Sequence, residues 1–160
     1  MEYNNTIAQA KANREKARAL LAITNEAQDL LQAAHDKLGS ARTWGVVDIL
    51  GGGFLTNMIK HSKIEDAMYY VNRARPILQD LGRALKQVRL DTTRAEMGVG
   101  SFAVFADFFF DGVFADVYVQ SKIRNLQVEI ERTLGQLDDV ETALRKLDEY
   151  ESKRILGSST

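Results

Sequence analysis

Apolar residues recur with a seven-residue period in three separate stretches of the chain, and this pattern constrains the fold more than any other feature. Each stretch carries two interleaved series. The series are Ala10, Ala17, Thr24, Leu31 and Leu38 with Leu20, Ala27 and Ala34; Ile64, Val71, Leu78 and Leu85 with Ala67, Ala74, Leu81 and Val88; and Ile123, Ile130, Leu137 and Leu144 with Leu126, Thr133, Val140 and Leu147. Such stripes are typical of long helices that pack side by side, as in coiled coils.

The sequence therefore predicts an all-α, elongated bundle of three long helices in a single domain, residues 1–160. A single proline among 160 residues agrees with long uninterrupted helices. The first helix is expected over about 6–38. Gly39 and Ser40 would end it there, because glycine accepts the left-handed backbone conformation common just after a helix.

Two parts of the chain also resemble each other at a fixed offset of 59 residues. Placing 48–88 on 107–147 without a gap gives ten identities in 41 positions, including Ser-Lys-Ile at 62–64 and 121–123. Amphipathic patterning alone does not produce such polar matches, so we predict an internal duplication with units at about 44–91 and 102–153. Ser62 and Ser121 are expected as helix N-caps. Pro76 and its counterpart Gly135 fall mid-helix, so each unit is expected to contain one bent helix.

A short apolar segment precedes each of the two repeated helices, and both are predicted to be short, largely buried helices that join the long ones. The second, residues 102–119, holds six of the seven phenylalanines. Asp107, the counterpart of Asp48, and Asp111 lie on its polar face, whereas Asp116 and its counterpart Asn57 fall near the apolar face. A buried polar group needs a hydrogen-bonding partner. Asp116 is thus either a structural contact or a ligand-binding carboxylate.

The stretch Gly51-Gly52-Gly53 suggests a phosphate-binding loop, but the context for one is missing. It lacks the Gly-Lys-Ser/Thr ending of a P-loop, and the second copy keeps only Gly112. We therefore expect a packing role for the shared glycine. The turn at Lys60–Lys63 is expected either as a solvated turn or as an anion site at a helix N-terminus. The candidate polar site consists of Asp48, Asn57, Lys60, His61, Ser62, Lys63, Asp107, Asp111 and Asp116.

Several kinds of chemistry are not supported by the sequence. Cysteine is absent, and no Glu-x-x-His pair or catalytic acid–base set is present, so we predict no catalytic residues, metal site or cofactor. Lys and Arg total 21 against 22 for Asp and Glu, which does not favour nucleic acid. No secretion signal or spanning helix is found, and the aspartates of 102–119 disfavour membrane insertion. A cytoplasmic location is expected.

Two motifs resemble a group of uncharacterised bacterial proteins. These proteins carry Trp-Gly-x-x-Asp-x-Leu-Gly-Gly-Gly and Lys-His-Ser-Lys, which correspond here to residues 44–53 and 60–63. A second motif of the same group resembles residues 105–112, Phe-Ala-Asp-Phe-Phe-Phe-Asp-Gly, followed by Asp116. The resemblance covers roughly residues 41–126 and implies a shared fold and a bacterial cytoplasmic setting, with no activity attached.

Two classes of function are compatible with these features. The first is a non-enzymatic interaction or scaffold protein that self-associates or binds a protein partner through helix faces, because the amphipathic helices exceed what a three-helix core can bury. The alternative is a binder of an apolar or anionic small molecule, or of a lipid surface, through the Phe-rich segment and the Lys60–Lys63 turn.

Overall fold

The computed structural model describes residues 2–47, 53–87 and 122–157, and all of these are helical. The helices are α1 (Glu2–Val47), α2 (Gly53–Gln87) and α4 (Lys122–Gly157). Side chains are described for residues 6–39, 63–85 and 126–157. The predicted all-α bundle of three long helices is confirmed.

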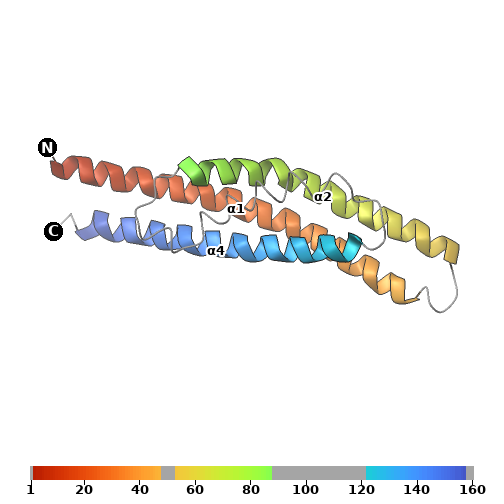
Figure 1. Cartoon of the computed structure of the whole chain (residues 1–160). Coiled ribbons are helices and arrows are strands. Elements are labelled where there is room, and N and C mark those ends of the chain that lie inside the picture. Colours follow the sequence, from red (N-terminus) through yellow and green to blue (C-terminus); the bar gives the residue numbers. More distant parts are fainter. Residues whose placement is uncertain (1, 48–52, 88–121, 158–160) are drawn as a thin grey trace.

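The three helices lie side by side in an elongated bundle (Figure 1). α1 runs from one end of the bundle to the other, and α2 returns antiparallel to it. α4 runs in the same direction as α2, so that the two chain termini lie at the same end (Figure 1). At about 1.5 Å per residue, the 46 residues of α1 extend roughly 70 Å.

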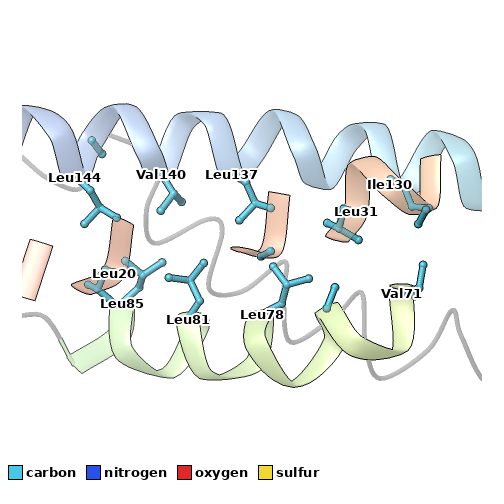
Figure 2. Close-up of a cluster of buried hydrophobic side chains, with 14 of the residues drawn as sticks. Leu20, Leu31, Val71, Leu78, Leu81, Leu85, Ile130, Leu137, Val140 and Leu144 are labelled. Atoms are coloured by element: carbon cyan, nitrogen blue, oxygen red, sulfur yellow. The ribbon is translucent and has the colours of Figure 1, made fainter. Parts of the chain in front are cut away.

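The core follows the heptad series of the sequence closely. All eight series residues of α1 are buried, as are the series residues of α2 and α4 from Ala67 to Leu85 and from Leu126 to Leu147. Figure 2 shows Val71, Leu78, Leu81 and Leu85 of α2 facing α4 across a core that also contains Leu20 and Leu31 of α1. Burying a side chain of this size contributes about 1.5–3 kcal/mol, so these layers supply most of the bundle's stability.

α1 lies closest to both of its neighbours. Close backbone contacts join α1 to α2 and α1 to α4, whereas few or none join the described parts of α2 and α4. The side chains explain this arrangement, because the distance between packed helices depends on the residues at the contact. Half of the buried positions of α1 are alanine, which allows close approach, while leucines and valines fill the wider space between α2 and α4.

The structure corrects the predicted end of the first helix. α1 does not stop at Gly39 and Ser40 but continues to Val47. Gly39 does not have the positive φ of a helix-ending glycine, and a Cβ atom added there would meet only the Gln127 side chain, at 3.9 Å. A glycine inside a helix costs about 1 kcal/mol, which is less than the burial of neighbouring Leu38 contributes.

The predicted start of the second long helix is also wrong. α2 begins at Gly53, so Ser62 lies inside the helix and is not its N-cap. The described residues of the short helix expected before Ser62 are not a separate element: they belong to the end of α1 and to the start of α2, and 48–52 lie outside the described residues. An N-cap contributes only about 1 kcal/mol, too little to end a helix whose upstream residues are themselves apolar and helix-compatible.

Two further predictions concern Pro76 and the start of α4. α2 continues through Pro76, which confirms one helix at this place. α4 begins at Lys122, directly after Ser121, which itself lies outside the described residues. The Phe-rich segment 102–119 lies outside them as well.

Candidate functional site

The most extensive set of specific contacts between the described helices is a row of polar side chains along α1 and α4, here called the α1–α4 polar seam. Its members are Asn13, Arg14, Arg18, Gln28 and His35 on α1 and Glu131, Asp138, Glu141, Asp148 and Glu151 on α4. Residue numbers rise along α1 as they fall along α4, as the antiparallel arrangement requires. The seam therefore fixes both the direction and the register of this helix pair.

Glu151 is the most deeply buried member, with 1% of its surface exposed. It occupies the next position of the α4 series that contains Leu137 and Leu144, where an apolar residue is expected. Its Oε1 accepts a hydrogen bond from Asn13 Nδ2 at 2.8 Å, and its Oε2 lies 2.7 Å from Arg154 Nη1. A buried carboxylate is tolerated only with such partners. The core thus changes from apolar to polar near the chain termini.

Asp148 holds two arginines of α1. Arg14 Nε and Arg18 Nε each donate to its Oδ1 at 3.0 Å. Burial raises the pKa of this carboxyl, but the hydrogen bonds from Arg14 and Arg18 and the charges of both arginines outweigh it, so the pKa lies below its ordinary value. Asp148 is therefore ionised at neutral pH and tethers α4 to α1.

The middle of the seam is built on Gln28. Its Nε2 donates to Asp138 Oδ1 at 2.7 Å and to Glu141 Oε2 at 3.3 Å. Glu141 also accepts from Arg145 of its own helix, at 2.8 Å from Nε. That hydrogen bond lowers the pKa of Glu141, burial opposes it, and the bond from Gln28 adds to the lowering.

His35 forms the last contact of the seam. Its Nε2 lies 2.8 Å from Glu131 Oε1, and its Nδ1 is 3.7 Å from Asp36 Oδ1. When Nε2 carries the proton, the ring donates to the glutamate. On the other side of α1, Lys37 Nζ approaches Asp66 Oδ2 of α2 at 3.7 Å. α1 thus contacts α2 and α4 through different polar side chains.

Two exposed tyrosines stand out on the outer faces of α2 and α4. Tyr69 is 57% exposed and Tyr150 is 60% exposed. Each has an arginine four residues further along: the guanidinium of Arg73 lies 5.7 Å from the Tyr69 ring centre, and that of Arg154 lies 5.8 Å from the Tyr150 ring. Cation–π contacts of this kind hold an exposed ring in place. We call them the outer Tyr–Arg pairs.

The structure gives little geometry for the residues predicted as a candidate polar site. Asp48, Asp107, Asp111 and Asp116 lie outside the described residues. Asn57, Lys60, His61 and Ser62 are in α2, but their side chains are not described, and Lys63 is half-buried in the same helix. Because α2 begins at Gly53, Lys60–Lys63 lie inside a helix, and the turn and helix start predicted there are wrong. Whether these residues bind an anion stays a prediction.

The seam was not anticipated from the sequence, although part of it left a signal there. Asn13 and Glu151 fall on the heptad series, at positions where the other members are apolar or small. A polar residue at such a position indicates a specific polar contact across the helix pair. Arg14, Arg18 and Asp148 lie on the flanks of the stripes, where charged residues are common on any solvated helix and carry no such signal.

No group of three or more acidic or histidine side chains in the described ranges is placed to hold a metal ion. Among the described helices, none is both long and apolar enough to cross a bilayer. Comparisons with protein-family models, with curated proteins and with solved structures find no match to the chain. The resemblance of the glycine-rich and Phe-rich motifs to uncharacterised bacterial proteins therefore stays a prediction.

Proposed function

We propose that this chain is a non-enzymatic helical interaction or scaffold protein that acts through helix–helix contacts in a bacterial cytoplasm, as a homo-oligomer or with a protein partner. The proposal includes the internal duplication, which places two similar helices beside α1. A rod of three long helices offers extended lateral faces to other chains. This shape supports binding to other proteins rather than catalysis.

The observation that carries the proposal is the outer Tyr–Arg pairs. Tyrosine and arginine are, with tryptophan, enriched among the residues that dominate binding energy at protein interfaces. Here both tyrosines are more than half exposed and each is accompanied by an arginine of its own helix. A ring that is already held in one place loses little freedom when a partner covers it.

The test combines self-association with site-specific capture. Sedimentation velocity over a wide concentration range is expected to show oligomers for the wild-type chain, or a photo-reactive side chain at 69 or 150 is expected to trap one defined protein in the source cell. Tyr69→Ala and Tyr150→Ala should weaken the association at least tenfold while leaving helix content unchanged. Gln79→Ala, on an exposed position of α2, serves as the control.

A strictly monomeric chain that also traps no defined protein from either tyrosine would contradict the proposal. The alternative, binding of an apolar or anionic small molecule or of a lipid surface, depends on residues 102–119 and on Lys60–Lys63. No contact among the described side chains favours it, and native mass spectrometry together with liposome flotation separates the two classes.

A further inference from the structure

α2 and α4, the two helices of the proposed duplication, could in principle occupy either side of α1. α2 and α4 both run antiparallel to α1, and their core positions match at the 59-residue offset, with Val71 opposite Ile130 and Leu78 opposite Leu137 (Figure 2). If the two helices exchanged places beside α1, the bundle would have the opposite handedness, and much of the same apolar core would still form. The leucine layers therefore discriminate poorly between the two arrangements.

The polar contacts of α1 discriminate far better. Five acidic residues of α4 contact α1: Glu131, Asp138, Glu141, Asp148 and Glu151. The equivalents of the first three, 59 residues earlier, are Asn72, Gln79 and Gly82 of α2, whereas the equivalents of Asp148 and Glu151 lie outside the described residues. Within α2, the three acidic residues are thus replaced by two amides and a glycine.

An exchanged bundle would lose these contacts. Gln28 would face Gln79 and Gly82 in place of Asp138 and Glu141, and His35 would face Asn72 in place of Glu131. On the other side of α1, Lys37 would lose Asp66, because the equivalent residue in α4 is Asn125. Polar contacts that form in one arrangement and are lost in the other favour the right pairing.

We propose that the polar faces of α1 select between the two repeated helices: the side with Arg14, Arg18, Gln28 and His35 accepts only α4, and the side with Lys37 accepts α2. The selection sets the handedness of the bundle. This selection concerns the folded monomer and does not depend on the proposed partner, so either proposal can be wrong while the other is right.

The absence of cysteine makes a direct test practical, because introduced cysteines are the only thiols. Lys37→Cys combined with Asp66→Cys reports the observed arrangement, and Lys37→Cys combined with Asn125→Cys reports the exchanged one. Both reporters lack the Lys37–Asp66 contact, so they are matched. With a short bis-maleimide cross-linker, the first pair should react at least ten times faster than the second.

The decisive variant exchanges the seam residues between the two helices. Asn72→Glu and Gln79→Asp, together with Glu131→Asn and Asp138→Gln, exchange two residues of each helix and preserve the composition. The cross-linking ratio should fall at least tenfold. Exchange of two outer residues, Tyr69→Val with Val128→Tyr, is the matched control and should leave the ratio unchanged, because both side chains point to solvent.

A variant with native helix content and an unchanged ratio would overturn the proposal. If the fourfold variant fails to fold, a second set of substitutions, in α1 and at Asp148, tests the proposal. Arg14→Glu with Arg18→Glu should lower the ratio, and adding Asp148→Arg should restore it, because the charges are then again opposite. Absence of this rescue would equally overturn the proposal.

Discussion

At the scale of single residues, Glu151 shows how a buried charge is kept in this bundle. Each of its oxygens has a partner, from Asn13 on α1 and from Arg154 on α4 itself. The arrangement costs desolvation, which an apolar layer would not, so its value lies in specifying which residues meet. The uniform leucine and alanine layers elsewhere cannot specify this.

Replacing Glu151 with alanine is expected to destabilise the protein by about 1–3 kcal/mol, because the part-buried Asn13 amide nitrogen and the Arg154 guanidinium both lose their hydrogen-bond acceptor. Glu151→Gln should cost less, since the amide oxygen can still accept. Urea unfolding followed by circular dichroism measures both. The exposed Glu149→Ala is the control, and an equal loss for it would contradict the assigned role.

The lowered pKa of Asp148 leads to a prediction of pH dependence. A carboxyl whose pKa is lower in the folded state contributes stability above the unfolded pKa of about 4, and this contribution is lost as pH falls through the folded pKa. At pH 7, Asp148→Asn should therefore lower stability by about 1 kcal/mol, since the site is partly exposed. Well below pH 4, the two proteins should unfold alike.

Thermal unfolding at several pH values checks this expectation. Adding salt at neutral pH should reduce the difference between wild type and Asp148→Asn, because Arg18 is largely exposed and its charge is screened. A difference that persists at pH 2.5 would mean that the asparagine acts through packing instead of charge.

At the scale of elements, the continuity of α1 through Gly39 is the main departure from the sequence-based prediction. Glycine followed by serine is a common helix end, and nothing local distinguishes it from a glycine within a helix. The outcome is set by packing, because Leu38 is fully buried in the core beside it.

The substitution Gly39→Ala distinguishes a glycine inside a helix from a glycine at a helix end. In a helix interior with only the Gln127 amide within 4 Å, alanine should stabilise the protein by about 1 kcal/mol. At a left-handed helix end the same change would destabilise it. Gly135→Ala, where an added Cβ meets nothing within 4 Å, should also stabilise and provides the positive control for melting experiments.

At the scale of the whole molecule, α2 and α4 share one core with α1, so a defect in any helix should be felt by all three. Leu78 is fully buried where the three helices meet (Figure 2). Leu78→Ala is expected to cost about 2–5 kcal/mol through lost burial and the cavity that remains. Hydrogen exchange should speed up in α1 and α4 as well as in α2.

Val128→Ala, on the exposed face of α4, should change stability by less than about 0.5 kcal/mol and is the matched control. Faster exchange confined to α2 in Leu78→Ala would contradict a shared core. Such a result would mean that α1 and α4 form a separate stable pair.

The seven-residue apolar period was enough to predict the fold class, the three helices and nearly every core residue. The reason is that such a stripe along a helix is buried against other helices. The tertiary structure was needed to show where the described helices end, which side chains form the α1–α4 polar seam, and on which side of α1 the helices α2 and α4 lie. These depend on contacts between residues as far apart as Asn13 and Glu151, and local pattern carries no information about such pairings.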